Sequence, residues 1–261
     1  MKFKLFQIDA FTDNVFKGNP ACVVPLEKWL DDQILLEIAK ENAVAETAFF
    51  TTDDDHFNLR WFTPDIEMDL CGHATLATAH CIFKELNYKK EKVIFETMSG
   101  KLEVTKIKNE YQMVLPSRPA ISTQLPVNIL NSLNIKPKEI YKSRDYLLIY
   151  ENQKAVENII IDRPVFDEIN INPGGVIVSA KGNHCDFVSR FFTPQATILE
   201  DPVTGSAHCT LTPYWSKKLG KTKLKAQQLS PRGGLLSCEL KENQVYILGK
   251  AVTYLKGSIV L

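Results

Sequence analysis

The sequence predicts an α+β protein built as two similar lobes. Strand-like segments outnumber helical ones along the chain. A short motif also returns in the second half, because RWFTP at 60–64 matches RFFTP at 190–194. In each half a Gly-polar-Ala triplet follows, at 72–74 and at 205–207, where a helical pattern begins. The recurrence of order and spacing indicates a duplicated lobe.

The first half contains most of the strand patterns. Strands are expected at 2–10, 19–26, 45–51, 57–62, 92–96 and 101–115, and helices at 28–41 and 72–86. The first helix carries its apolar residues on one face. The second is small or apolar nearly all round in its first turns, which predicts a helix buried on every side.

The second half repeats this style after a proline-rich stretch. Strands are expected near 144–150, 157–161, 175–179 and 186–193, followed by a helix at about 205–219 and by strands to the end. Pro116, Pro119 and Pro126 mark the boundary. The N-terminal lobe is therefore expected at 1–116 and the C-terminal lobe at 117–251, and a last strand at about 252–261 could return to the first lobe.

The repeat predicts how an anion could bind. The RWFTP match has an offset of 130 residues, which places Cys71 opposite Asp201. A three-residue insertion then aligns 72–74 with 205–207. Two such lobes facing each other would bring two helix N-termini to one cleft. Free N–H groups and positive dipole ends there would suit a substrate carboxylate.

Composition excludes several classes of function. The 31 basic and 31 acidic residues of the 261-residue chain cancel, which gives no electrostatic case for nucleic acid or an acidic membrane. No apolar run is long enough to span a bilayer, and the N-terminus alternates polar and apolar residues, so a cytoplasmic protein is expected. There is no dinucleotide, P-loop or zinc-protease motif.

The six cysteines indicate neither disulfides nor a metal site. No C-x-x-C pair is present, and a chain of this size does not need disulfide bonds for stability. Three His-Cys doublets occur, but adjacent side chains point in different directions and make a poor chelate. We therefore expect reduced thiols and no metal.

Four motifs carry a family resemblance over the whole length. They are FQIDAFTDNVFKGNPACVV at 6–24, ENAVAETAFF at 41–50, FTP followed by CGHATLATAH at 62–80, and DPVTGSAH at 201–208. Together these segments resemble the PhzF-like phenazine biosynthesis family. The resemblance implies a diaminopimelate epimerase-like fold, in which each lobe is a curled mixed β-sheet wrapped around a central helix. It also implies a homodimer and a cofactor-independent isomerase.

The resemblance assigns roles to particular positions. The family's catalytic glutamate corresponds to Glu46, its Gly-His helix start to Gly72 and His73, and its second-lobe motif to the segment from Asp201 to Ser206. In relatives that isomerise a dihydro-hydroxyanthranilate, the glutamate moves a proton across one face of the ring. The histidine, aspartate and serine hold the carboxylate and amino groups. The implied substrate is a small amino or hydroxy carboxylate.

The residues themselves fit this chemistry. Glu46 is the only charge in the apolar run 43–50. Burial of a carboxyl group raises its pKa toward neutrality, which suits an acid/base. An exposed or helix-capping glutamate is the alternative. His73 begins a helix whose dipole is expected to lower its pKa, so that it acts as a neutral hydrogen-bond donor; a capping or packing histidine is the alternative.

The second-lobe motif offers further candidates. Asp201 precedes a proline, so its backbone is extended and its side chain could bind an ammonium group or act as a second acid/base. Its alternative role is a helix cap, as it is for Ser206. Gly72 and Gly205 let the backbone approach a ligand closely. Weaker candidates are Asn19, Asp9 and the turn at 232–234.

Two other functions stay open. An amino-acid racemase or epimerase of this fold would use two thiols, but the repeat places Asp201 opposite Cys71, which leaves a mixed pair. A non-catalytic binding or scaffold protein is the third reading, because a fold alone does not determine function. The acidic, imidazole and hydroxyl groups present at the four family positions argue for an enzyme.

Overall fold

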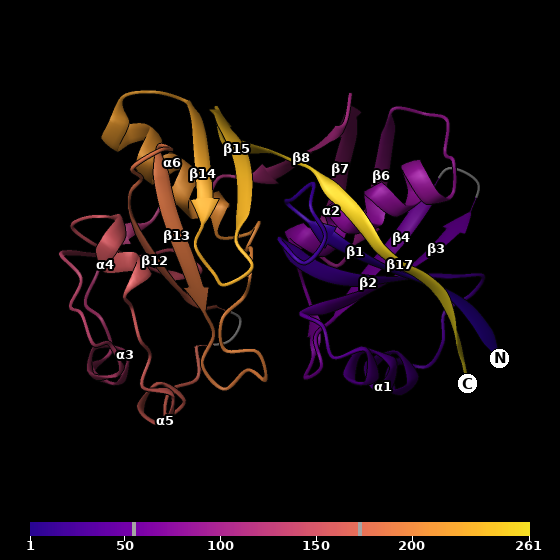
Figure 1. Ribbon diagram of the computed structural model, residues 1–261, viewed down its shortest axis with the longest axis horizontal. Helices are drawn as coiled ribbons and strands as arrows, with labels where there is room; N and C mark the ends of the chain where they lie inside the picture. Colours follow the sequence, from indigo (N-terminus) through magenta and orange to yellow (C-terminus); the bar gives the residue numbers. More distant parts are fainter. Residues whose placement is uncertain (54–55, 172–173) are drawn as a thin grey trace. The chain divides into compact units, whose positions relative to one another are not determined.

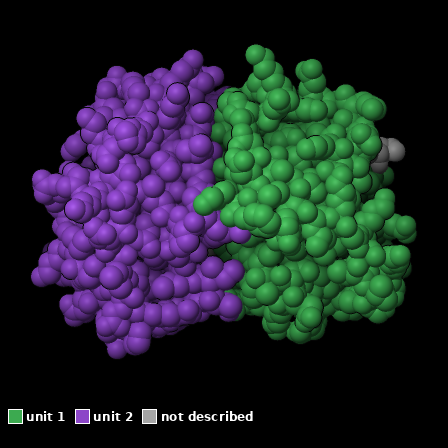
Figure 2. Space-filling view, in the orientation of Figure 1, with its two compact units in different colours: residues 1–115, 247–261 green, residues 116–246 purple. Residues whose placement is uncertain are grey.

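The protein divides into two compact units, each with its own core. A computed structural model describes residues 1–53, 56–171 and 174–261. Unit 1 comprises Met1–Leu115 and Ile247–Leu261, and unit 2 comprises Pro116–Tyr246 (Figure 2). The secondary structure is α+β, with strands more numerous than helices (Figure 1).

Unit 1 is a mixed sheet with two helical segments. Its strands are β1 (Lys2–Ala10), β2 (Asn19–Leu26), β3 (Glu46–Asp53), β4 (His56–Phe62), β5 (Glu67–Met68), β6 (Lys92–Thr97), β7 (Gly100–Ile107), β8 (Glu110–Pro116) and β17 (Ala251–Val260). Its helices are α1 (Asp32–Asn42) and α2 (Gly72–His80), which continues into a π-helical turn, η1 (Cys81–Glu85). The last strand of the chain pairs antiparallel with the first.

The central helix of unit 1 is α2. Its nine residues are all buried, and most of them are small. Small side chains let the surrounding strands approach closely, and α2 contacts β1, β2, β3 and β17 (Figure 1). The expectation of a helix buried on every side is confirmed. The helix carries residues of the candidate site at its first turn, so the core fixes their position.

Unit 2 has the same plan with more short elements. Its strands are β9 (Ile121–Ser122), β10 (Glu139–Lys142), β11 (Tyr146–Ile149), β12 (Val176–Lys181), β13 (Phe187–Phe192), β14 (Lys223–Gln228) and β15 (Gly234–Lys241), and β16 (Gln244–Gly249) leads back into unit 1. Its helices are α3 (Val127–Ser132), α4 (Gln153–Glu157), α5 (Arg163–Phe166) and α6 (His208–Leu219). Within the described part of the chain, no helix is both long and apolar enough to span a membrane.

The strand pairings confirm the internal repeat. In unit 1 the order β2-β3-β4-β6-β7 is joined by parallel, antiparallel, parallel and antiparallel pairs. In unit 2 the order β11-β12-β13-β14-β15 is joined by the same sequence of pairs. Each unit also has its long helix between the third and fourth strands of this series, α2 in one and α6 in the other. The predicted two-lobed, mixed-sheet fold is therefore correct.

The insertion in the repeat lies earlier than the sequence indicated. Phe62 pairs with Glu67 in unit 1, and Phe192 bridges Glu200 in unit 2. The first pair of equivalent positions differs by 130 residues and the second by 133. The three extra residues therefore belong to the loop that follows FTP, before the chain returns to the sheet.

This placement corrects the expected match of Cys71 with Asp201. With an offset of 133 already in force, Asp201 corresponds to Met68, and Cys71 corresponds to Thr204. The error arose because the loop length cannot be read from the motif alone. In the repeat, the residue opposite the Cys71 thiol is therefore a threonine and not a second acid.

One expected strand is wrong. Residues 157–161 do not form a strand, because α4 occupies 153–157 and only Ile161 makes an isolated bridge, with Leu133. The side chain of Asn152 accepts a hydrogen bond from the backbone N–H of Ala155 at 3.0 Å and so caps α4. This N-cap signal outweighs the β-branched residues that follow.

Two expected helices begin later than predicted. The first starts at Asp32 and not at residue 28. The second, α6, starts at His208, because residues 205–207 form a tight turn. The N–H groups of His208 and Cys209 donate to the carbonyls of Gly205 and Ser206, three residues back, at 3.1 Å each. Such bonds describe a 3₁₀-like turn leading into the helix.

Candidate active site

Glu46 is the first residue of β3 and is largely shielded from solvent. It lies beside Ala21 of the parallel neighbour β2. Helix α1 ends at Ala43, whose left-handed backbone (φ 51°) turns the chain sharply into the strand. The Glu46 side chain is 13% exposed. A carboxylate in this position keeps only a small opening to solvent.

His73 faces Glu46 from the first turn of α2. Its Nε2 lies 3.1 Å from Glu46 Oε2, and its side chain is 2% exposed. Both atoms are inaccessible to solvent, and their mutual angle does not meet hydrogen-bond geometry, so neither has a hydrogen-bond partner among the described residues. The contact is therefore an ion-pair contact in which both groups keep hydrogen-bonding capacity for a third group.

Asn19 holds the other side of the imidazole ring. Its Nδ2 lies 3.0 Å from His73 Nδ1, and both side chains are buried. Cys71 Sγ lies 3.5 Å from the same nitrogen. These two contacts leave the ring little freedom to rotate, so Nε2 stays directed at Glu46. Asn19, a weak candidate in the sequence, is thus part of the same cluster.

The pKa of His73 shifts in the direction opposite to the one expected from the helix dipole. Burial lowers the pKa, but the neighbouring Cys71 sulfur and Glu46 carboxylate raise it, and the net shift is upward from 6.5. Burial, with the charge of Glu46, raises the pKa of Cys71 to about 11, so this thiol stays protonated at neutral pH. Glu46 is therefore the partner that favours an imidazolium at His73.

Glu46, Cys71 and His73 could also be considered as metal ligands. Their ligand atoms lie within 4.8 Å of one another. Cys71, however, contacts Nδ1 of the ring whereas Glu46 contacts Nε2. An ion bound by all three would require the ring to turn and to lose its contact with Asn19. The geometry therefore fits a hydrogen-bonded acid/base cluster better than a metal site.

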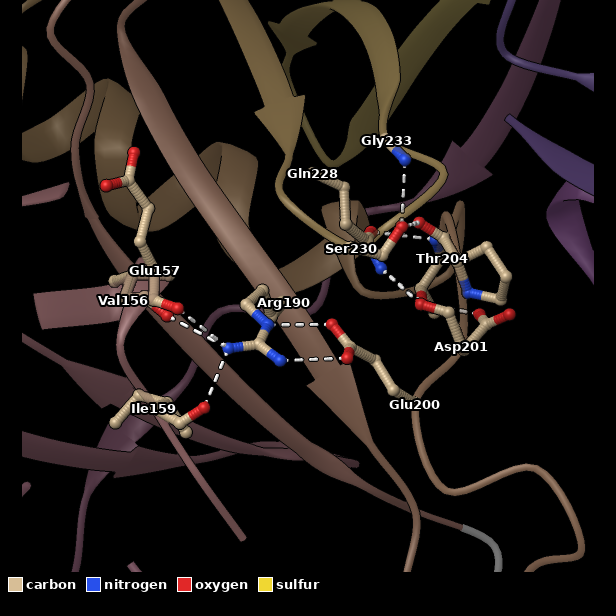
Figure 3. A network of polar contacts seen from close by, with 11 residues as sticks. Val156, Glu157, Ile159, Arg190, Glu200, Asp201, Thr204, Gln228, Ser230 and Gly233 are labelled. Carbon is tan, nitrogen blue, oxygen red and sulfur yellow. Dashed lines mark hydrogen bonds and ion pairs between the residues drawn. The ribbon is translucent and has the colours of Figure 1, made fainter. Parts of the chain in front are cut away.

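Asp201 belongs to a separate polar network in unit 2 (Figure 3). Its Oδ2 accepts a hydrogen bond from Thr204 Oγ1 at 2.5 Å. The buried side chain of Gln228 accepts from the Thr204 N–H at 2.8 Å and donates to the Asp201 carbonyl at 2.8 Å. Asp201 therefore orders its own loop and does not cap α6.

A second turn supports the same loop. Ser230 Oγ donates to the carbonyl of Pro202 at 2.8 Å and accepts from the N–H of Gly233 at 3.0 Å (Figure 3). Gly233 adopts φ 67°, a conformation that favours glycine. The Arg-Gly-Gly segment at 232–234 is thus a turn that packs against the Asp201 loop.

Gly205 and Ser206 form the turn that precedes α6. Gly205 is buried and Ser206 is partly exposed. The N-cap position belongs to Ala207, and its side chain makes no capping bond. The expected capping role of Ser206 is therefore not seen: its carbonyl, and not its hydroxyl, accepts the hydrogen bond from the Cys209 N–H.

An arginine–glutamate pair anchors the Asp201 loop to the sheet. Arg190 Nε and Nη2 contact the two carboxylate oxygens of Glu200 at 2.7 and 2.8 Å. Its Nη1 also donates to the carbonyls of Val156 and Ile159 at 3.2 and 2.9 Å (Figure 3). The repeat has its counterpart in unit 1, where Arg60 binds Glu67 at 2.7 Å through two bonds.

The candidate residues thus form two groups. Unit 1 contains Asn19, Glu46, Cys71, Gly72 and His73, which lie together. Unit 2 contains Asp201, Gly205 and Ser206. Asp9 is buried, and its Oδ2 accepts from the N–H of Phe16 at 2.9 Å, which supports the 11–18 loop. Sequence analysis missed Thr204 and Gln228. Thr204 lies inside the DPVTGSAH motif, but Gln228 carries no motif signal.

Known proteins place this fold and site in one class. A solved PhzF-family protein from Enterococcus faecalis is 44% identical, with a TM-score of 0.93 and complete coverage of both chains. A hydroxyproline epimerase from Agrobacterium vitis has a TM-score of 0.63 at 9% identity, covering 99% of this chain and 92% of its own, which is a likeness of fold alone. The protein is an α+β isomerase of the diaminopimelate epimerase-like fold.

The family follows from the sequence comparisons. The family model for phenazine biosynthesis-like proteins, PhzC-PhzF, matches residues 8–257. An uncharacterized isomerase of Pseudomonas aeruginosa is 43% identical over 260 residues, covering 99% of both chains. A human phenazine biosynthesis-like domain-containing protein is 36% identical over 288 residues, with 99% coverage of each chain. The chain therefore belongs to the PhzC-PhzF family.

Proposed function

We propose that this isomerase moves a proton within a small amino or hydroxy carboxylate, without a cofactor, and that Glu46 is the acid/base. The observation that carries the proposal is the contact of 3.1 Å between Glu46 Oε2 and His73 Nε2. Both atoms are buried and lack a hydrogen-bond partner among the described residues. Buried polar atoms normally have partners, so this pair suits a substrate that supplies them.

The two side chains take complementary roles. Glu46, as a carboxylate, accepts a proton from a carbon next to a carbonyl or carboxylate and returns it at another carbon. His73, held by Asn19 and favoured as an imidazolium, stabilises negative charge that develops during the transfer. A pair preorganised in this way needs little rearrangement when the charge moves.

The unit 2 residues are proposed to bind the substrate's other groups. The Asp201 carboxylate would hold an ammonium group, and the backbone and hydroxyl of Gly205 and Ser206 would hold a carboxylate. The support is the family motif together with the turn that exposes the start of α6. A helix N-terminus offers unpaired N–H groups and a positive dipole end for an anion.

A racemase using Cys71 is the second candidate. Cys71 Sγ lies 3.5 Å from His73 Nδ1, close enough for the imidazole to take its proton. Against it, burial keeps this thiol protonated at neutral pH, and the repeat places Thr204 at the equivalent position. A scaffold protein would leave the buried, unpartnered atoms of Glu46 and His73 without an explanation.

The test is proton exchange with solvent. The wild type and the Glu46→Gln and Cys71→Ala variants are incubated in deuterium oxide with a panel of small amino and hydroxy carboxylates, including a dihydro-hydroxyanthranilate. NMR then follows deuterium incorporation and rearrangement. The proposal expects exchange in the wild type and in Cys71→Ala and none in Glu46→Gln. Loss in Cys71→Ala with retention in Glu46→Gln would favour the racemase.

Assembly and location are further proposals. The family resemblance supports a homodimer, which light scattering on the purified protein would test. All six cysteines are free thiols, which fits a reducing compartment such as the cytoplasm. Labelling of the thiols in intact cells would test this location.

A further inference from the structure

Arg118 carries a guanidinium group that the described protein leaves without a partner. The residue is only partly exposed, and its Nη1 is inaccessible to solvent and makes no hydrogen bond. In the ranges that the structure describes, no carboxylate forms an ion pair with it. Its backbone N–H donates to the carbonyl of Cys209 at 2.8 Å, which fixes the residue beside the first turn of α6.

The surroundings of Arg118 carry an excess of positive charge. Burial raises the pKa of Cys209 to about 12, the guanidinium groups of Arg118 and Arg144 oppose this rise, and the carboxylate of Asp145 adds to it. Two cations and one anion therefore act on the same sulfur. The Asp145 carboxylate already accepts a hydrogen bond from the N–H of Gly175 at 2.9 Å, which occupies part of its capacity.

An anion is the group that completes this arrangement. Burying a guanidinium nitrogen without an acceptor is unfavourable. A carboxylate matches the guanidinium because its two oxygens can accept two parallel N–H bonds. The first turn of α6 adds the positive end of a twelve-residue helix on the same side.

We propose that Arg118 is the receiving group of a carboxylate-binding subsite at the first turn of α6. The N–H of Cys209 bonds to the carbonyl of Ser206, so the subsite lies about one helical turn, ~5 Å, from the Ser206 turn. A small dicarboxylate can span such a distance. The subsite goes beyond the proposed proton transfer, because it requires neither Glu46 nor turnover.

Succinate is a suitable probe, and calorimetry on the full chain measures its dissociation constant. The proposal expects Arg118→Met to weaken succinate binding about tenfold or more, as for loss of a charge-assisted hydrogen bond. Arg118→Lys, which keeps the charge but not the planar fork, should bind with intermediate affinity. Lys181→Met removes an exposed cation of the same unit and should stay within about twofold of the wild type.

Two further readings make the test decisive. Glu46→Gln should bind succinate like the wild type, so failure of the proton-transfer role and failure of this subsite are distinguishable. Without succinate, Arg118→Met should melt at the wild-type temperature or above, because the side chain has no partner to lose. Equal affinity in Arg118→Met, no binding to the wild type, or a melting temperature lowered by this variant without succinate would each overturn the proposal.

Discussion

His73 Nε2 lies 3.1 Å from Glu46 Oε2, although the two residues come from different elements of unit 1. The strand β3 starts at Glu46, and α2 places His73 in its first turn. Because α2 is buried on all sides, neither residue can move away without opening the core. The contact is thus a consequence of the fold and not of a flexible loop.

The raised pKa of His73 predicts a loss of stability with rising pH. A histidine whose pKa is higher in the folded than in the unfolded state contributes stability below its unfolded value of about 6.5. That contribution disappears as the pH rises through the folded value. Denaturant unfolding of the wild type should show a falling free energy above pH 6.5, and His73→Gln should show a flatter profile. Parallel profiles would contradict the shift.

Two other histidines predict sensitivity to acid. Burial lowers the pKa of His80 and of His208 to about 4. Unfolding lets both groups take up protons near pH 6.5, so stability is complete above that pH and falls between about 6.5 and 4. Each histidine is worth roughly 3 kcal/mol at most over this range. Replacing His208 by Gln should remove part of this slope in acid unfolding curves, whereas an unchanged slope would show that the histidine titrates normally.

The two repeated arginines should differ in their contribution to stability. Arg190 is 13% exposed and also binds backbone carbonyls, whereas Arg60 is 22% exposed and has Asp32, itself largely exposed, as its further partner. Arg190→Leu leaves a half-buried carboxylate unpaired and should cost about 3 kcal/mol of unfolding free energy. Arg60→Leu should cost less, about 1 kcal/mol. Equal losses in urea unfolding would argue against a structural role of the extra carbonyl contacts.

Gln228 is predicted to position the Asp201 loop. Gln228→Leu removes the bonds to Thr204 and to the Asp201 carbonyl, and should cost about 2 kcal/mol in unfolding free energy. If Asp201 binds substrate, kcat/KM should also fall roughly tenfold to a hundredfold. The neighbouring Gln227→Leu is the matched control, because Gln227 lies on the same strand and is only partly buried. Similar behaviour of the two variants would contradict the positioning role.

The fold was predictable to the extent that it depends on local pattern and repetition. The RWFTP repeat and the small-residue helix at 72–80 indicate two similar lobes with a buried helix, and the strand pairings agree. The length of the loop after FTP has no such signal, which is why Cys71 was matched to Asp201. The helix at 153–157 was missed because its N-cap, Asn152, is a single residue.

The site was predictable where a motif carries it. Glu46 and His73 come from motifs, and the structure brings their side chains into contact. Their electrostatics were not predictable, because the pKa of His73 depends on how close the carboxylate lies. Gln228 and Arg118 stand outside any motif, and their roles follow only from contacts between residues far apart in the sequence.

The central claim is that Glu46 transfers the proton, and the rate of C–H exchange tests it most directly. With a substrate found in the carboxylate panel, the rate in deuterium oxide is compared among the wild type, Glu46→Gln and Glu41→Gln. Glu41 is an exposed glutamate near the end of α1 in the same unit. The account predicts a fall of about a thousandfold in Glu46→Gln and no change in Glu41→Gln. Exchange at the wild-type rate in a folded Glu46→Gln protein would contradict it.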